Sequence, residues 1–179
     1  LAQPDFNAPE KGSVAYITSD YNTGYMVGDI KLAALSDTDD TDVVGTELVT
    51  NGTFDTDTSG WTSSGAGVIA YSGSALNLTG NAYAYQTIPT IIGQYYEVQA
   101  EVTAISGAAS FEIRVGDSIN SSALVGGTSY SSPRTMYSAF VAISTSTFVT
   151  LKNHGAAGGT HVVTWDNVTC RLADKDRSV

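Results

Sequence analysis

The clearest fold signal in this chain is Asn51-Gly-Thr-Phe-Asp-Thr-Asp-Thr-Ser-Gly-Trp61. Its opening Asn-Gly pair favours positive φ and a tight turn, and its Ser-Gly pair bends the chain again just before the tryptophan. Phe54 and Trp61 are too apolar to remain in solvent, so we expect the two turns to bring both rings into one core. We interpret the stretch as the corner of a β-sandwich, with a structural rather than a catalytic role.

Length, composition and charge limit the classes of protein that fit. The chain has 179 residues, which suits one main domain, and its 18 Gly and 10 Tyr belong to a composition typical of strands and turns. Its formal net charge of -10 argues against nucleic acid as a partner, because phosphates require a Lys/Arg surface. No apolar run is long enough for membrane insertion. The sequence starts at Leu1 without an initiator Met, and its first residues show no leader pattern, so we expect a fragment or a processed product.

The first 45 residues differ from the rest and are predicted to form a connector with a β-hairpin. Two apolar runs, at 13–18 and 25–35, are separated by a turn, and a helix over 30–35 is the competing interpretation. We expect this hairpin to dock on a partner or to support oligomerisation, because its edges would otherwise be exposed. The acidic run at 36–42 is predicted to be a linker, and residues 174–179 a C-terminal tail.

Residues 46–173 are predicted to form an all-β domain, an antiparallel β-sandwich or jelly roll. Short apolar or alternating runs recur between Gly, Ser and Asn punctuation, and no amphipathic helix interrupts them. The expected strands are 47–50, 67–71, 75–79, 83–88, 95–105, 110–115, 137–143, 147–152 and 160–172. The longest loop is expected at 120–133, and such loops often carry specificity.

Alternation within two of these runs predicts which side chains form the core. One set is apolar and is expected to face inward: Tyr96, Val98, Ala100, Val102, Phe111, Ile113 and Val115. The other set is expected to face outward: Tyr95, Glu97, Gln99, Glu101, Glu112 and Arg114. Trp61 and Trp165 are expected in the core, and Cys170 is expected to be a small core residue rather than a nucleophile.

The order of five short motifs resembles the jelly-roll carbohydrate-binding modules of the CBM4/CBM22-like superfamily. The motifs are Asn51-Gly-Thr-Phe54, Gly60-Trp61, Tyr85-Gln-Thr-Ile88, Gly93-Gln-Tyr-Tyr-Glu-Val98 and Val163-Thr-Trp-Asp-Asn-Val168, and they cover about residues 46–172. In that family an acidic residue follows the phenylalanine, and in this chain that residue is Asp55. The aromatic binding platform of the family has no clear counterpart in the sequence.

A second resemblance concerns residues 14–38, which look like a connector that recurs in tailed-phage virion proteins. There it leads from an upstream β-rich region into a carbohydrate-binding-like module. The resemblance implies a virion or tail-fibre-type protein at the virion surface or in the extracellular space. The implied partners are other virion subunits and further copies of the chain, a homo-oligomer for which a trimer is one option.

Candidate catalytic groups are few. The carboxylates of Glu97, Glu101, Glu112, Asp117 and Asp166 show no spacing that selects an acid/base pair, so no enzymatic activity is expected. His154 and His161 bracket a glycine-rich loop and could hold a metal, but two imidazoles without a third ligand favour exposed loop ends.

A structural calcium ion is implied by the family resemblance. It would fall near Asn51, Thr53, Asp55 and Asp166, since hard cations take carboxylate and carbonyl oxygens from turns. The alternative is a β-bulge or turn at Asp166-Asn167 whose side chains cap backbone N–H groups. The acidic run at 37–42 is a weaker candidate because it lacks the Gly and Glu of an EF-hand loop.

Glycan binding requires aromatic rings for stacking and polar groups for hydroxyls, and several residues combine the two. The candidates are Tyr83, Tyr85, Gln86, Tyr95, Glu97, Gln99 and Tyr130, with Tyr137 as a further option. The alternative is that half of these tyrosines fill the edge of the core.

Three functions remain open from the sequence. The first is a non-catalytic virion appendage whose sandwich adheres to host-surface glycans or decorates the particle. The second is the ancillary carbohydrate-binding module of a secreted glycoside hydrolase. The third is a pure assembly module without glycan binding.

Overall fold

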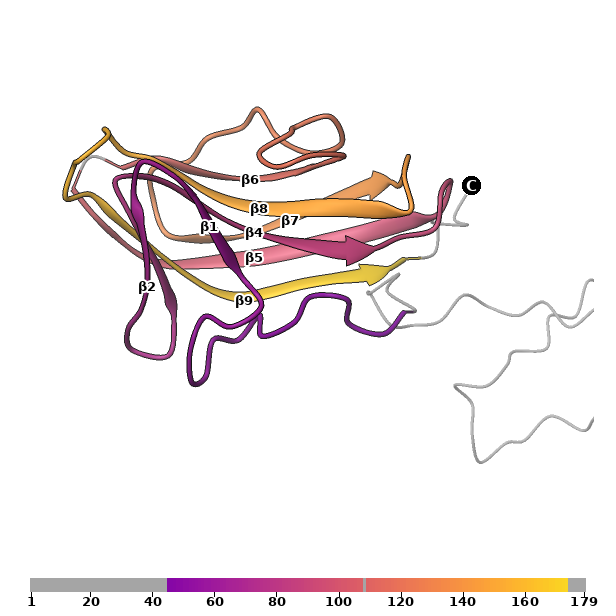
Figure 1. Cartoon of the computed structure of the whole chain (residues 1–179), viewed down its shortest axis with the longest axis horizontal. Coiled ribbons are helices and arrows are strands. Elements are labelled where there is room, and N and C mark those ends of the chain that lie inside the picture. The colour runs from indigo at the N-terminus through magenta and orange to yellow at the C-terminus, as the bar shows by residue number, and fades with distance from the viewer. Residues whose placement is uncertain (1–44, 108, 174–179) are drawn as a thin grey trace, which may run out of the picture. The chain divides into compact units, whose positions relative to one another are not determined.

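The computed structural model describes residues 45–107 and 109–173, which form an all-β antiparallel sandwich (Figure 1). No helix lies in this part of the chain, and none there is long and apolar enough to cross a membrane. The strands are β1 (Thr62–Gly65), β2 (Val68–Tyr71), β3 (Leu76–Thr79), β4 (Asn81–Pro89), β5 (Tyr95–Ser106), β6 (Phe111–Gly116), β7 (Arg134–Val141), β8 (Ser146–His154) and β9 (Val162–Leu172). The predicted fold class is confirmed.

Two sheets make up the sandwich. The four-stranded sheet has the order β1-β4-β8-β6, and the five-stranded sheet has the order β2-β3-β9-β5-β7. All the pairings of named strands are antiparallel, as alternating rather than continuous apolar runs require. In each sheet one face is therefore packed inside the sandwich and the other is turned outward.

The core lies between the two inner faces and follows the predicted alternation. In β5 the inward residues Tyr96, Val98, Ala100 and Val102 are at most 3% exposed. Phe111 of β6 meets the indole of Trp165 edge-on, with ring centroids 5.5 Å apart and both side chains fully buried. The predicted core positions are confirmed on both strands.

The corner at 51–61 closes this core as expected. Phe54 and Trp61 are buried, and their ring centroids lie 5.7 Å apart. Asn51 has φ 50°, and its carbonyl accepts a hydrogen bond from Trp61 Nε1 at 3.2 Å, so the turn and the indole hold each other. Gly52 is required because a Cβ there would collide with the carbonyl of Val168.

Strand boundaries were predicted less well than the strands themselves. β1 (Thr62–Gly65) was missed because its sequence, Thr-Ser-Ser-Gly, reads as a loop; pairing with β4 makes it a strand. β7 begins at Arg134 and ends at Val141, earlier at both ends than predicted. Residues 47–50 form no assigned strand, although Leu48 donates a backbone hydrogen bond to Cys170 of β9.

The predicted hairpin at 13–35, the acidic linker and the C-terminal tail lie outside the described residues, as does the weaker calcium candidate at 37–42. The division into connector, module and tail therefore stays a prediction.

Candidate functional site

The outer face of the four-stranded sheet carries a strip of half-buried aromatic rings. Strand alternation turns Tyr83 and Tyr85 of β4 outward, while the alternating Ala82 and Ala84 are fully buried. On β8 the same alternation turns Phe148 outward, and its ring centroid lies 6.1 Å from that of Tyr85. We call Tyr83, Tyr85 and Phe148 the aromatic strip. Rings placed on an outer face offer a surface for stacking a ring-shaped ligand.

Polar side chains border the aromatic strip on both sides. Lys152 Nζ lies 5.2 Å from the ring centroid of Tyr83, a cation–π distance. Burial lowers the pKa of Lys152, and the nearby Arg114 guanidinium lowers it further, while Glu112 opposes this change. On the opposite side, β1 places Thr62 directly across from Tyr85. The strip is thus flanked by an amine and by hydroxyl groups.

Glu112 is the electrostatic centre of the same face. Its outward orientation was predicted, but its side chain is almost completely buried rather than solvated. Its Oε1 contacts Arg114 Nε and lies 2.8 Å from His154 Nε2, with Lys152 Nζ at 4.0 Å. Its Oε2 accepts the backbone N–H of Gly127 at 3.2 Å. One buried carboxylate therefore holds three basic side chains and a loop.

The loop between β6 and β7, residues 117–133, covers the half of this face nearest β6. Arg114 Nη1 donates to the carbonyl of Asn120 at 3.1 Å, and Asn120 N–H donates to Thr150 Oγ1 at 3.4 Å. Thr150 faces outward on β8 yet is fully buried, which shows that the loop lies over it. The aromatic strip is the half of the face that remains accessible.

The outer face of the five-stranded sheet holds another part of the predicted glycan-binding set. Tyr95, Glu97 and Gln99 face outward on β5, and Tyr137 of β7 pairs with Gln99. Tyr137 is 64% exposed. The structure therefore separates these residues from Tyr83 and Tyr85, which lie on the opposite side of the sandwich.

Gln86 faces neither outer surface, which corrects its placement beside the tyrosines. Its side chain is buried and points inward from β4. Its Oε1 accepts the N–H of Thr50 at 2.6 Å, and its Nε2 donates to the carbonyls of Thr50 and Gly60. All of these contacts tie the corner at 51–61 and its approach to β4, so Gln86 has a structural role.

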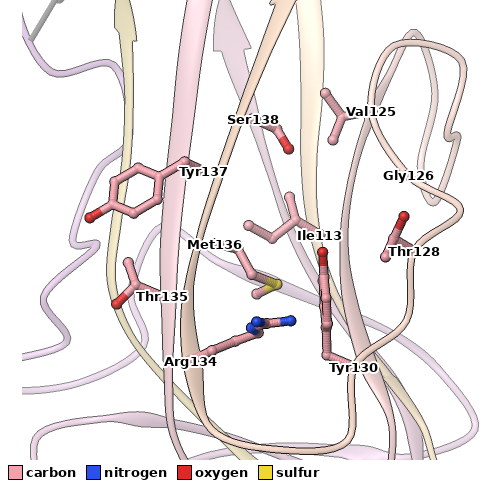
Figure 2. Close-up of a pocket in the computed structure, with 10 residues that line it drawn as sticks. All are labelled: Ile113, Val125, Gly126, Thr128, Tyr130, Arg134, Thr135, Met136, Tyr137 and Ser138. Carbon is pink, nitrogen blue, oxygen red and sulfur yellow. The ribbon is translucent and has the colours of Figure 1, made fainter.

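Tyr130 occupies a third place, a cavity of about 260 Å³ between the edge strands β6 and β7 (Figure 2). Its backbone exchanges two hydrogen bonds with Phe111 of β6, at 2.8 and 2.9 Å. Its ring is half-buried and lies 4.1 Å from the guanidinium carbon of Arg134. This cavity is separate from the aromatic strip.

The four residues of the expected calcium site lie at the corner and on β9. Thr53 Oγ1 donates to Asp55 Oδ2 at 2.8 Å, and Asn51 Nδ2 donates to the carbonyl of Asp57 at 3.0 Å. Within the described residues, no three His, Cys, Asp or Glu side chains form a group that could hold a metal. Any ion there would depend on two carboxylates and on neutral oxygens.

Asp166 sits at the β-bulge that the sequence offered as the alternative. The pairing of β9 with β5 shifts register here, and Asn167 adopts φ 48°. Asp166 Oδ1 accepts the N–H of Asn167 at 2.7 Å, which is the capping role expected for a bulge. Burial raises the pKa of Asp166, and the charges of Glu101 and Asp55 raise it further, against the lowering effect of the Asn167 N–H.

The remaining reactive groups lie apart from one another. Cys170 is fully buried, as predicted, and burial together with the charge of Glu47 raises the pKa of its thiol to about 12. His154 is held by Glu112 at the end of β8 and is not a bare loop end. His161 accepts through its backbone carbonyl from Gly80 N–H, a turn contact.

Sequence reasoning missed Phe148, Lys152 and Arg134. The signal for the first two was present, because Phe148, Thr150 and Lys152 alternate with apolar Val149 and Leu151 in a strand that was predicted. Arg134 gave no signal, since it lies between the predicted loop at 120–133 and the predicted strand at 137–143.

Comparison with solved structures places the fold among jelly-roll carbohydrate-binding modules. The chain is similar to the CBM22-1 xylan-binding domain from Paenibacillus barcinonensis Xyn10C, with TM-score 0.54 and 16% identity over 75% of this chain and 99% of that one. It is also similar to the N-terminal cellulose-binding domain of Cellulomonas fimi β-1,4-glucanase C, with TM-score 0.53 and 18% identity over 72% and 99% of the two chains.

A third similar structure contains a carbohydrate-binding module next to a catalytic one. It is the CBM22-1–GH10 part of Clostridium thermocellum endo-1,4-β-D-xylanase 10B in complex with xylohexaose, with TM-score 0.50 and 15% identity over 76% of this chain and 30% of that one. The sequence matches no family model and no curated protein. The described residues share the jelly-roll fold of these carbohydrate-binding modules.

Proposed function

We propose that this chain is a non-catalytic carbohydrate-binding module whose glycan site is the aromatic strip. The observation that carries the proposal is the placement of Tyr83, Tyr85 and Phe148 on an outer face of a sandwich with this fold. Monomeric proteins rarely place several aromatic rings together on their surface. A row of rings next to polar groups suits ligands that are apolar on one side and polar on the other.

Sugar rings have this two-sided chemistry. Their C–H faces stack on aromatic rings, and their hydroxyls need donors and acceptors at the ring edge. Lys152 and Thr62 flank the strip on opposite sides and supply such groups. The buried Glu112 and its basic partners fix the position of Lys152 and of the covering loop, so the strip meets its ligand in an ordered setting.

A glycan array probed with the 179-residue chain tests the proposal. We expect binding that is lost in Tyr85→Ala and kept in Tyr95→Ala, which is the matched tyrosine on the other face. The reverse result would move the site to the five-stranded sheet. No binding to any glycan, together with a stable oligomer, would support the assembly module instead.

The parent protein is a separate proposal. We propose a virion or tail-fibre-type appendage that adheres to host-surface glycans, supported by the likeness of residues 14–38 to a tailed-phage connector. The alternative, an ancillary module of a secreted glycoside hydrolase, is supported by the similarity to a module that adjoins a xylanase. Neighbouring genes distinguish the two: virion genes favour the first, and a catalytic domain in the same reading frame favours the second.

Oligomerisation and calcium complete the proposal. A homo-oligomer formed through the N-terminal connector would be seen by light scattering and lost when residues 1–44 are removed. Calcium is proposed between Asp55 and Asp166, because burial raises the pKa of Asp166 and the charges of Glu101 and Asp55 raise it further, and a bound cation would offset both effects. Carboxylate and hydroxyl oxygens are the donors this ion prefers.

A further inference from the structure

The cavity that contains Tyr130 lies at one edge of the sandwich, between the two sheets. β6 is an edge strand of one sheet and β7 of the other. Residues 125–130, which we call the crossing segment, run antiparallel beside β6 before the chain reaches β7 (Figure 2). This segment bonds to β6 at both ends, through Val125 to Val115 and through Tyr130 to Phe111. Backbone hydrogen bonds to β6 therefore fix the segment that lines one side of the cavity.

The cavity has an apolar floor and a polar rim. Ile113 and Met136 form the floor and are at most 8% exposed. Arg134, Met136 and Ser138 project from one side of β7 into the cavity, while Thr135 and Tyr137 point away from it (Figure 2). The side chains at the rim are those of Thr128, Tyr130, Arg134 and Ser138.

Backbone polarity adds to this rim. The N–H and C=O groups of Phe111 and Val115 point to the β6 edge, where they bond to the crossing segment. Strand parity directs the same groups of Ile113, midway between them, toward that edge. The cavity thus has a backbone donor and acceptor beside its apolar floor.

Arg134 supplies a charge that has no carboxylate partner among the residues the structure describes. Among the described residues, Arg114, Lys152 and His154 lie in ion-pair range of Glu112, and Arg171 of Glu47, but Arg134 is in no such pair. Its guanidinium lies instead over the face of the Tyr130 ring, 4.1 Å from the centroid. In a chain of net charge -10, a held and uncompensated guanidinium points to an anionic ligand.

We propose that this cavity is a second site, which binds a single carboxylate-bearing sugar unit. Its volume of about 260 Å³ lies just below the range for drug-sized ligands and suits one ring. The guanidinium would take the carboxylate through two parallel hydrogen bonds, Ile113 and Met136 would meet the C–H face, and Thr128 and Ser138 would meet hydroxyls. The inference goes beyond the proposed function and does not depend on the aromatic strip.

Titration of the full chain with D-glucuronic acid, followed by ¹H–¹⁵N NMR, tests the proposal, with D-glucose as the neutral control. We expect millimolar affinity for the acid, peak shifts confined to residues 111–115, 124–130 and 134–138, and no such shifts with glucose. N-acetylneuraminic acid and D-galacturonic acid distinguish which acidic sugar fits best. Equal binding of glucose, or no shift with any of the three acids, would overturn the proposal.

Variants identify the responsible charge. Arg134→Gln should weaken binding of the acid about tenfold or more, and Arg134→Lys should restore part of it, because lysine keeps the charge but not the fork of donors. Arg171→Gln removes an arginine elsewhere on the surface and should leave the affinity for the acid unchanged. Unaltered affinity in Arg134→Gln with an unaltered melting temperature would contradict the assignment. Tyr85→Ala should leave binding of the acid unchanged, and a loss there would place the acid on the aromatic strip.

Discussion

The two outer faces of the sandwich differ in how their carboxylates are paired with basic side chains. On the four-stranded sheet, Glu112 is buried and surrounded by Arg114, Lys152 and His154. On the five-stranded sheet, Glu101 and Asp166 are paired across β5 and β9, and no basic side chain of the described residues lies in ion-pair range of either. The first face is compensated and covered by a loop; the second is open, with Arg171 across from Glu97 but two acids facing each other at Glu101 and Asp166.

This difference shows why strand alternation alone does not locate a binding face. Tyr83 and Tyr95 both lie on outward positions of long strands, and the sequence around each has the same alternating form. What separates them is the neighbouring strand. β8 brings Lys152 beside Tyr83 and Phe148 beside Tyr85, whereas β7 brings the exposed side chain of Val141 beside Tyr95. The contributions of the two outer faces to glycan binding and to stability can therefore be compared with matched variants, one on each face.

The largest expected effect is on stability. Glu112→Ala should lower the free energy of unfolding by about 3 kcal/mol, because three basic side chains lose their buried partner. In thermal unfolding this corresponds to a fall of roughly 6–12 °C. Glu97→Ala, the same change on the open face, should stay within about 0.5 kcal/mol. Equal losses for the two variants would show that the faces are not different.

Calcium is expected to act on the corner next to the open face. At a free-ion concentration of about 100 times Kd it should stabilise the fold by about 2.7 kcal/mol. Melting scans with calcium and with a chelator measure the effect, and Asp55→Asn should abolish it. Identical transitions in both buffers would rule the ion out.

Recognition should be confined to the compensated face. For a glycan that binds the chain, Phe148→Ala should weaken affinity about tenfold, on the order of 1.4 kcal/mol, through lost apolar contact. Tyr137→Ala removes a more exposed ring from the open face and should leave the calorimetric Kd unchanged. A loss of affinity in Tyr137→Ala alone would transfer recognition to the open face.

The smallest expected effect depends on pH. The folded-state pKa of Asp166 is raised above 3.8, so the contribution of this group to stability is full below that pH and is lost as pH rises through the raised pKa. Without calcium, Asp166→Asn should therefore become slightly more stable than the parent chain over that window.

A neighbouring acid gives the control with the opposite sign. Hydrogen bonds from Ser59 lower the pKa of Asp57, so its contribution is present above 3.8 and is lost as pH falls through the lowered value. Asp57→Asn should lose stability relative to the parent chain as pH rises through that window. Stability differences from the parent chain that do not change with pH in either variant would contradict both assignments.

The sequence predicted the sandwich because its signals are local. Alternation in β5 and β6, the turn at Asn51 and the apolar Phe54 and Trp61 each follow from neighbouring residues. β1 was missed because a Thr-Ser-Ser-Gly strand exists only through pairing with β4.

The sites were predicted only in part, because they depend on contacts between distant segments. Tyr83 and Tyr85 were selected by type, but the strand order that puts β8 beside β4 is not written in either strand. The same holds for Gln86, whose partner Thr50 is 36 positions away. The burial of Glu112 required the position of Gly127, which no periodicity encodes.

The backbone bonds between the crossing segment and β6 also bear on solubility. An edge strand with free N–H and C=O groups is a template for pairing with another chain. In β6 the edge-facing N–H and C=O groups of Phe111 and Val115 are already bonded to Tyr130 and Val125. A strand from another molecule therefore finds no continuous row of free backbone groups to pair with. A variant with a shortened 117–133 loop should therefore form intermolecular β-structure and precipitate at concentrations where the parent chain stays clear.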